Sequence, residues 1–269
     1  MAPAPSPPWV TAEMSGSVLW LTLNRPGQRN PLSSQMIDLL QESLAAAEAD
    51  TDVRCIVIAG SGPAFSAGHD LREMAPQAGE TDVACKARMR GILEACSRLM
   101  LGITQSPKAV VACVQGIATA AGCQLVAACD LAIASEEARF CLPGVNIGAF
   151  CTTPLVAVGR NIHRKHAMEL ALTGDLFDAG DAVRMGLVNR AVAADRLHSV
   201  TEQLAQKIAS KSTEGIARGK SAFYEQLNQP LAEAYGTTCE PMIETMTTAD
   251  AREGTQAFFG KRQPVWPQG

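Results

Sequence analysis

The feature that most constrains this chain is an almost uncharged run over residues 109–134, in which Asp130 is the only charged residue. Residues 109–114 are apolar and rich in β-branched side chains, which favours a strand. A Gln-Gly pair interrupts the pattern, helix-compatible residues follow over 124–129, and strand character returns over 131–134. The run therefore predicts a strand, a turn, a helix and a second strand, all of them buried.

Four small residues, TAAG at 119–122, lie where this helix is expected to begin. A ligand can approach the backbone closely there, at the end of a helix where amide hydrogens lack internal acceptors. Such a site suits an oxygen atom that acquires negative charge. From this segment alone, the simpler interpretation is that small residues let the helix and strand pack tightly.

A second motif, FSAGHDL at 65–71, follows the apolar run 55–59 and the turn-forming residues 60–63. It too predicts a strand, a glycine turn and the start of a helix. Ordinary alternatives fit it poorly: Ser66 lacks the G-x-S-x-G context of a hydrolase nucleophile, and the nearby glycines do not complete a dinucleotide fingerprint.

Together, FSAGHDL at 65–71 and VQGIATAAGCQLVAACD at 114–130 resemble the crotonase (enoyl-CoA hydratase/isomerase) superfamily. The resemblance continues through LNRPGQRNPLS at 23–33, TGDLFDAGDAVRMGLVNRAV at 173–192 and EGTQAFFGKRQPVW at 253–266. Within the superfamily, the motifs are similar to the branch called enoyl-CoA hydratase domain-containing protein 3. The resemblance implies an α/β fold, a crotonase-like spiral of strand-strand-helix units with a C-terminal helical oligomerisation region.

Composition limits the class of protein. The chain has 269 residues, enough for one sizeable core with an appendage, and no apolar stretch of membrane-spanning length without a charge or turn. Its first residues, MAPAPSPPWV, lack the pattern of a signal peptide, so we expect a cytoplasmic protein with no membrane partner. Nine cysteines without a CxxC pair indicate buried thiols and no metal site, and a net charge of −4 argues against a nucleic-acid partner.

Capping residues and apolar spacing position the core elements. A half-buried strand is expected over 17–23, Ser33 or Ser34 can cap the next helix, and Asp178 can cap a helix that Gly186 ends. Core-facing helical stripes are expected at Met36, Leu40, Leu44 and Ala47; at Met89, Leu93, Cys96, Met100 and Ile103; and at Leu197, Val200, Leu204 and Ile208.

The end of the chain is predicted to be all helical, over 213–228, 231–246 and 251–259. We therefore expect an acyl-CoA-binding core over 1–205 and a helical trimerisation region over 206–269, which is too short to form a full core alone. In the resembled family such a region packs against neighbouring subunits, which implies a homotrimer or a dimer of trimers. The apolar residues expected to need this cover are Ile216, Phe223, Leu227 and Met242.

The resemblance implies that the substrate is an acyl-CoA thioester whose carbonyl is polarised by the backbone amides of His69 and Ala121. Coenzyme A carries phosphates and so requires local cations, although any single candidate alone is more simply a surface charge. Arg25 and Arg262 are further candidates from composition. The contacts that the resemblance favours are Arg29, Ala67, His69, Asp70, Leu71, Arg72, Ala121 and Lys261. No cofactor is expected beyond the coenzyme A moiety of the substrate.

The chain departs from the hydratase pattern at both catalytic glutamates, which are replaced by Gln124 and Gly144, and Thr152 stands where a dienoyl-CoA isomerase relative has an acid. An amide can position water but cannot accept its proton at neutral pH, and glycine has no side chain. We therefore expect poor hydration.

Three functions remain open. The chain is either a hydratase-like enzyme that stabilises a thioester enolate by another route, a malonyl-type acyl-CoA decarboxylase, or a non-catalytic acyl-CoA-binding or regulatory protein. The segments 65–71 and 143–148 are also similar to methylmalonyl-CoA decarboxylase, a superfamily member that lacks the hydratase acids.

Overall fold

The computed structural model describes residues 7–267. Its larger sheet has six strands, of which the first pair is antiparallel and the others are parallel. In spatial order these strands are β1 (Val10–Ser15), β2 (Val18–Leu23), β3 (Cys55–Gly60), β5 (Ala109–Val114), β7 (Leu131–Ser135) and β10 (Arg190–Val192). A smaller sheet contains β4 (Ala64–Ser66), β6 (Ile117–Thr119), β8 (Arg139–Cys141) and β9 (Phe177–Asp178).

The two sheets are built by a repeated unit. β3, β5 and β7 each lie in the larger sheet and each is followed by a short strand in the smaller one, β4, β6 and β8 respectively. Helical segments follow each pair: α2 (Leu71–Met74) and α3 (Asp82–Gln105), then α4 (Ala121–Ala128), then α5 (Pro154–Asn161) and α6 (Arg164–Thr173). The spiral of strand-strand-helix units expected from the resemblance is confirmed.

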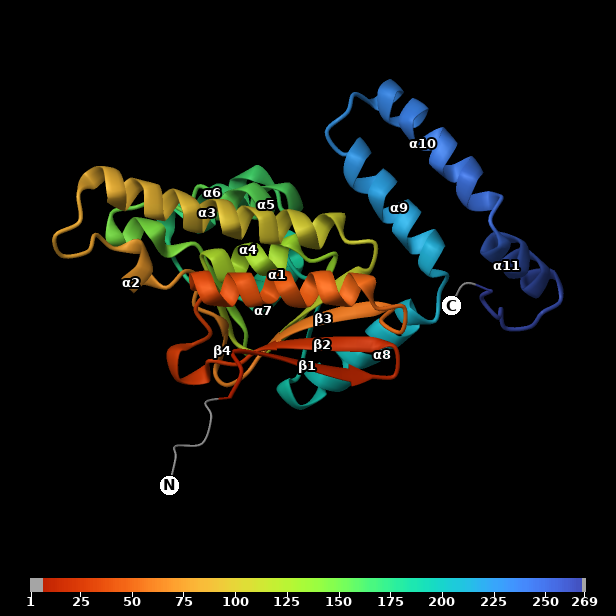
Figure 1. The fold of residues 1–269 in the computed structure, drawn as a ribbon, viewed down its shortest axis with the longest axis horizontal. Coiled ribbons are helices and arrows are strands. Elements are labelled where there is room, and N and C mark those ends of the chain that lie inside the picture. The colour runs from red at the N-terminus through yellow and green to blue at the C-terminus, as the bar shows by residue number, and fades with distance from the viewer. Residues whose placement is uncertain (1–6, 268–269) are drawn as a thin grey trace.

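Helices cover both faces of the larger sheet, as Figure 1 shows. α1 (Ser34–Ala49), α3 and α4 lie on one face, and α8 (Leu197–Ala209) lies on the other. Along β3, Ile56 and Ile58 join the cluster under α1 and α3, whereas Cys55 and Val57 join the cluster against α8. Burial on both faces explains why the parallel strands are continuously apolar rather than alternating.

Most predicted elements are confirmed, with two informative differences. The Ser33 side chain accepts a hydrogen bond from the Met36 amide at 3.3 Å, and Asp178 caps α7 (Ala179–Met185), which Gly186 ends in the left-handed conformation. β1, β6, β8, β9 and β10 were not predicted, because β1 is an edge strand with exposed residues and the other four have only two or three residues each. On α3 the predicted Cys96, Met100 and Ile103 are buried, whereas Met89 and Leu93 are only half-buried. On α8 the predicted Leu197 is buried and Val200, Leu204 and Ile208 pack half-buried against the core, but the rest of the fully buried line is Thr201, Ala205 and Ala209.

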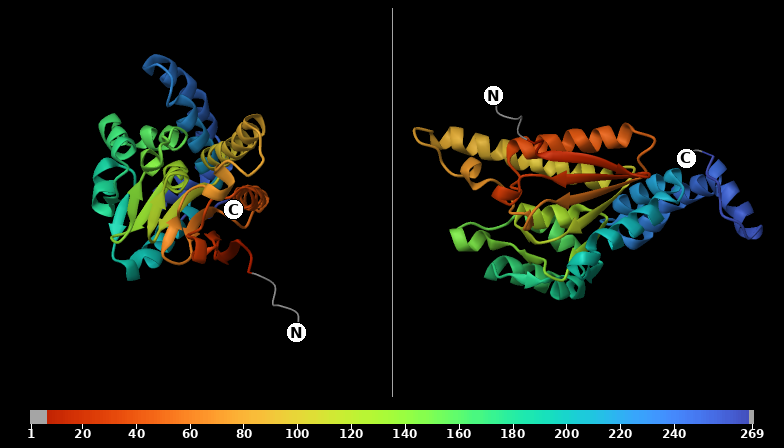
Figure 2. Two further views of the ribbon diagram at one scale, coloured as in Figure 1. Left: turned by 90° about the vertical axis from the view of Figure 1, so that its left-hand side faces the viewer. Right: turned by 90° about the horizontal axis from the view of Figure 1, so that it is seen from below.

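The C-terminal helices α9 (Thr213–Gln226), α10 (Leu231–Met246) and α11 (Ala249–Phe259) extend away from the sheets (Figures 1 and 2). The division expected after residue 205 falls inside α8, whose Ala209 is still buried against the sheet, so the helical region starts at α9. Phe223, Leu227 and Met242 are 53%, 50% and 61% exposed, as expected. Ile216 is instead half-buried, because it packs against the cluster beneath the sheet.

A polar anchor holds α9 to the core. Asp130, the lone charge of the apolar run, accepts hydrogen bonds from Lys220 Nζ at 2.7 Å, Tyr224 Oη at 2.9 Å and the Val110 amide at 2.7 Å. Lys220 also donates to the Ile103 carbonyl at 2.9 Å. The Lys220 and Asp130 side chains are only 8% and 17% exposed, so their charges are compensated mainly by each other and by these hydrogen bonds.

Replacing Lys220 by Met should lower the free energy of unfolding by about 2–4 kcal/mol, because it leaves the Asp130 carboxylate largely buried without its counter-ion. Urea unfolding followed by circular dichroism measures this loss. Lys207→Met, at an exposed lysine of α8, is the matched control and should change stability by less than about 0.5 kcal/mol. Equal effects of the two substitutions would contradict the anchor.

Candidate active site

The two sequence motifs meet backbone against backbone. A Cβ atom added at Gly122 would lie 2.4 Å from the Ser66 carbonyl oxygen, which is too close for any side chain. One added at Gly68, where φ is +81°, would lie 2.8 Å from the Thr119 carbonyl oxygen and 3.2 Å from the Ala121 nitrogen. Small residues are therefore required for tight packing, and this packing brings the backbone of the turn after β4 to the start of α4.

Two backbone amides are presented at this contact. Ala121 is the first residue of α4, where amides lack intrahelical acceptors, and its nitrogen would lie 3.2 Å from a Cβ atom added at Gly68, the residue before His69. Neither the His69 nor the Ala121 amide donates a hydrogen bond to another residue within the described range 7–267. Two free donors held close together can bind an oxygen atom that gains negative charge.

The backbone around these amides is held firmly. Ala120, which precedes α4, has φ 48° and ψ −117°, and its amide donates to the Cys141 carbonyl at 3.0 Å. The Leu32 amide donates to the Gly68 carbonyl at 2.8 Å. A non-glycine residue at such angles is strained by about 1–3 kcal/mol and persists only where its surroundings determine it. The residue type at 120 gives no sign of this strain, so the sequence did not identify it.

The His69 side chain is also constrained. Its Nδ1 lies 3.2 Å from the Leu32 carbonyl oxygen, which can only accept, so Nδ1 carries the proton. Burial lowers the pKa of the imidazole, with smaller opposing effects from Leu32 and Glu73. The ring is therefore neutral at pH 7, and its Nε2 is a buried acceptor without a partner among the described residues.

Gln124 is buried and Gly144 is half-buried, and neither carries a charge. Gln124 lies in α4 and is 4% exposed, and its Oε1 has no hydrogen-bond partner within residues 7–267. Gly144 lies in the short 3₁₀ helix Pro143–Ile147 and packs against Cys151. Cys151 lies shortly before the start of α5, the helix that contacts α4. Burial raises the pKa of the Cys151 thiol, so it is protonated at neutral pH and is a poor base.

Gly144 is not required for its backbone angles. Its φ lies outside the left-handed region, but a Cβ atom there would lie 3.0 Å from both the nitrogen and the Sγ of Cys151. The obstacle to a side chain at this position is therefore crowding. Thr152, the position of the isomerase acid, follows this contact directly.

Most of the predicted coenzyme A contacts lie in one group of loops. Arg29 is exposed after the 3₁₀ helix Pro26–Gln28, and its carbonyl accepts a hydrogen bond from the Ala67 amide at 2.9 Å. Asp70 caps α2, which begins at Leu71, and pairs with Arg72 at 3.0 Å. The side-chain hydrogen bond from Arg72 lowers the pKa of Asp70.

Lys261 is separated from this group. It follows α11, which lies at the opposite end of the molecule from α2 in both Figure 1 and Figure 2. A single chain therefore does not bring Lys261 to Arg29 and Arg72, and its place among the coenzyme A contacts stays a prediction that requires another copy. Arg262, the other tail candidate, pairs with Glu253 at 2.8 Å between Nη2 and Oε2.

The sequence missed Asn30, which fixes this loop group. Asn30 is fully buried with φ 51°, and its Nδ2 donates to the carbonyls of Ser61 at 2.9 Å and Ala64 at 2.8 Å. It thereby holds the Arg29 loop against the entry to β4. The available signal was an asparagine in a proline-glycine turn, since asparagine tolerates left-handed angles better than most residues.

Neither a metal site nor a membrane-spanning helix is found within residues 7–267. Within that range no group of three or more His, Cys, Asp or Glu residues is arranged to hold a metal ion. None of the helices there combines the length and apolar character needed to cross a bilayer.

The paired strands and the spiral of strand-strand-helix units define an α/β fold, at whose central contact the His69 and Ala121 amides lack acceptors among residues 7–267. A family model described as Enoyl-CoA hydratase/isomerase matches residues 13–269. The chain belongs to the enoyl-CoA hydratase/isomerase family.

The relatives are similar over nearly the whole chain. The rat protein (Rattus norvegicus) named enoyl-CoA hydratase domain-containing protein 3, mitochondrial, is 39% identical, over 98% of this chain and 86% of the relative. The crystal structure of its human counterpart matches with a TM-score of 0.91 at 39% identity, covering 96% of this chain and 100% of that one. An enoyl-CoA hydratase from Mycobacterium smegmatis matches with a TM-score of 0.91 at 42% identity, covering 97% and 99%. The similarity to the branch predicted from the motifs is confirmed.

Replacing Gly122 by Ala should disrupt the contact between the two turns, because its Cβ would overlap the Ser66 carbonyl. We expect a loss of at least about 3 kcal/mol, the upper part of the range for overpacking, since the overlapping atom belongs to the backbone. Thermal unfolding measures the effect. Gly159→Ala in α5 is the control: no atom lies within 4 Å of its added Cβ, so stability should hold or rise by up to about 1 kcal/mol. A fully stable Gly122→Ala protein would show that the contact is looser than described.

Proposed function

We propose that this chain is an acyl-CoA enzyme that stabilises a thioester enolate with the backbone amides of His69 and Ala121 and without the two hydratase carboxylates. The observation that carries the proposal is the pair of unpaired amides at the contact of the two turns. Comparable donors elsewhere contribute about 10²–10³ in rate. The family membership supports an acyl-CoA substrate, since members of the family are named enoyl-CoA hydratases.

The surroundings of the amides favour a reaction that needs no base at its start. Gln124 and Gly144 carry no charge, burial lowers the pKa of His69, and burial keeps the Cys151 thiol protonated. A neutral, buried site stabilises the spread charge of an enolate relative to a localised carboxylate. This observation favours decarboxylation of a malonyl-type thioester.

In that reaction the bond between the α-carbon and the carboxylate carbon breaks, and carbon dioxide leaves. The electron pair of the bond forms the enolate, whose oxygen is held by the His69 and Ala121 amides. Water then supplies the proton that the α-carbon takes up. The alternative, a non-catalytic acyl-CoA-binding or regulatory protein, would use the same amides for binding alone, and only turnover separates the two.

The coenzyme A moiety would lie near Arg29 and Arg72, and no separate cofactor is proposed. Exposed apolar side chains on α9 and α10, such as Phe223 and Met242, support assembly into a homotrimer or a dimer of trimers. A cytoplasmic location stays a prediction from the sequence. The rat and human relatives named enoyl-CoA hydratase domain-containing protein 3 carry names that place them in mitochondria.

Bound butyryl-CoA should show its thioester carbonyl stretch at lower frequency than in water, because two amide donors polarise the carbonyl. Infrared difference spectra with the carbonyl labelled by carbon-13 measure the shift without requiring turnover. Any folded fraction of Gly122→Ala should lose the shift, while Gly159→Ala should keep it. Tight binding with an unshifted carbonyl would overturn the proposal. Malonyl-type thioesters tested in parallel for release of carbon dioxide decide between catalysis and binding.

Wild-type protein should hydrate crotonyl-CoA very poorly, whereas Gln124→Glu combined with Gly144→Glu should gain measurable hydratase activity. Paired carboxylates activate water and deliver its proton, and such catalysis is worth about 10²–10⁴-fold. Each single change should yield much less, since both groups act on one water molecule. The crowding at Cys151 requires a parallel set carrying Cys151→Ala, with folding checked by circular dichroism. Efficient hydration by the wild type would refute the argument from missing acids.

A further inference from the structure

The His69 amide is the less constrained half of the proposed oxyanion site. The Ala121 amide belongs to α4, a helix of eight residues, which fixes its direction. The His69 amide instead lies in the turn between β4 and α2, and the residue before it is Gly68, with φ +81°. Glycine loses more conformational freedom than any other residue when it is fixed, so this peptide has to be held by other bonds.

Leu32 holds this peptide at two points. Its amide donates to the Gly68 carbonyl at 2.8 Å, and its carbonyl oxygen accepts from Nδ1 of the His69 imidazole at 3.2 Å. Leu32 and His69 also form an isolated parallel β-bridge. Leu32 is itself a fixed point, because it is fully buried and directly precedes Ser33, the N-cap of α1.

These bonds set the direction of the His69 amide. The Gly68–His69 peptide is trans, so the Gly68 carbonyl and the His69 N–H point to opposite sides of it. The carbonyl points to Leu32, and the N–H therefore points away from Leu32. The preceding N–H, that of Gly68, donates to Ser66 Oγ at 3.2 Å, and this hydroxyl donates to the Asn30 carbonyl at 2.8 Å. Of these two amides, only that of His69 lacks an acceptor among residues 7–267.

The imidazole makes no second polar contact that would explain its presence. Its Nε2 is buried without a hydrogen-bond partner in the described part of the chain, so this atom does not reach a bound thioester. Burying an acceptor in this way costs about 1–3 kcal/mol, which an apolar side chain would avoid. The bond from Nδ1 to Leu32 is therefore what the ring contributes.

We propose that the His69 imidazole is a positioning group for the backbone amide of its own residue. By donating from Nδ1 to the Leu32 carbonyl, the ring keeps that amide directed at the substrate oxygen. The inference rests on the proposed function, because it assigns a role within the same oxyanion site. The main chain of His69 contacts the thioester, and its side chain acts only through Leu32.

A comparison of His69→Leu with His69→Asn tests this role. The two new side chains are similar in size, but only asparagine can donate a hydrogen bond to the Leu32 carbonyl. Bound butyryl-CoA should lose most of its carbonyl stretch shift in His69→Leu, and His69→Asn should restore much of it. Where a malonyl-type thioester is turned over, kcat of His69→Leu should fall by up to about 10²–10³, the contribution of one whole donor.

Binding of free coenzyme A separates positioning from a general loss of structure. Free coenzyme A has no thioester carbonyl, so its dissociation constant should be unchanged in His69→Leu. A loosened turn would also weaken this binding, because the Ala67 amide donates to the Arg29 carbonyl at 2.9 Å and so ties the turn to the Arg29 loop. Equal losses of carbonyl shift and of coenzyme A binding would overturn the positioning role.

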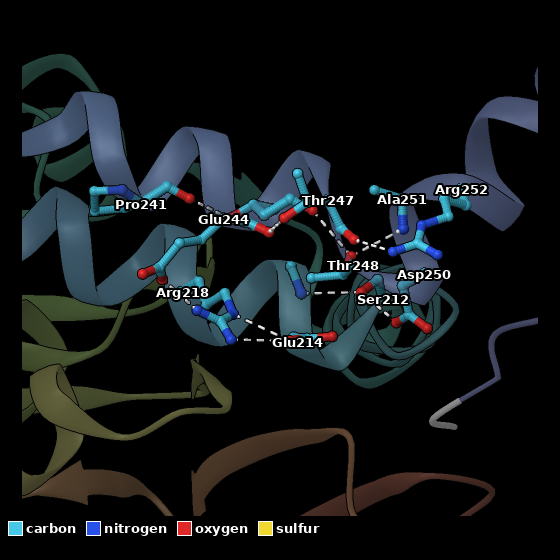
Figure 3. A network of polar contacts seen from close by, with 12 residues as sticks. Ser212, Glu214, Arg218, Pro241, Glu244, Thr247, Thr248, Asp250, Ala251 and Arg252 are labelled. Atoms are coloured by element: carbon cyan, nitrogen blue, oxygen red, sulfur yellow. Dashed lines mark hydrogen bonds and ion pairs between the residues drawn. The ribbon is translucent and has the colours of Figure 1, made fainter.

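Two variants elsewhere serve as controls. His163→Leu makes the same replacement at an exposed histidine that precedes α6 and whose side chain does not cap that helix. Arg218→Met removes the ion pairs of Arg218 with Glu214 at 3.1 Å and with Glu244 at 2.6 Å, in the C-terminal helices (Figure 3). Both variants should keep the full carbonyl shift, which excludes destabilisation as the cause of its loss in His69→Leu.

Solid-state NMR of wild-type protein labelled with nitrogen-15 in histidine tests the bond itself, even if His69→Leu fails to fold. The two tautomers of a neutral imidazole give different nitrogen signals, and a spectrum of His69→Asn identifies those of His69. We expect the proton on Nδ1 at pH 7. A proton on Nε2 alone would overturn the proposal, because Nδ1 could not then donate to Leu32.

The remaining outcomes separate this inference from the proposed function. A full carbonyl shift in a folded His69→Leu protein, with folding checked by circular dichroism, would overturn the positioning role and leave the oxyanion site intact. Equal losses in His69→Leu and His69→Asn would overturn it too. An unshifted carbonyl in the wild type would instead refute the proposed function on which the inference rests.

Discussion

The structure depends on the close approach of two glycine turns, the one after β4 and the one that starts α4. At this contact a Cβ on Gly122 would overlap the Ser66 carbonyl, and one on Gly68 would meet the Thr119 carbonyl. The contact connects the first and second repeats of the spiral and strains Ala120. It also leaves the His69 and Ala121 amides without acceptors among residues 7–267. The same steric requirement therefore accounts for the packing of the core and for the proposed oxyanion site.

The chemistry that this site can support follows from what surrounds the amides. Backbone donors stabilise charge on a substrate oxygen regardless of side chains, so the proposed oxyanion site would keep this capacity where Gln124 and Gly144 stand in place of acids. A neutral imidazole at His69 and a protonated thiol at Cys151 add no strong base at pH 7. The arrangement favours reactions in which charge is released into the thioester rather than reactions that begin with proton abstraction.

The C-terminal helices are held to the core by buried polar contacts of α9. Asp130 and Lys220 fix α9 to the edge of the core, with their charges mostly buried. At the far end Asp250 is only 1% exposed, and its Oδ1 has no hydrogen-bond partner among residues 7–267.

Local periodicity and capping residues in the sequence indicated an α/β fold and the helix caps at Ser33 and Asp178, while the resemblance of its glycine motifs to the family implied the spiral and the candidate amides. The sequence did not anticipate the edge strand β1 or the inward line of small residues on α8, since packing distance decides these. Only the tertiary structure showed that crowding by Cys151 restricts position 144, and that Lys261 lies far from Arg29 within one chain. Such relations depend on residues brought together from distant segments, and no local pattern records them.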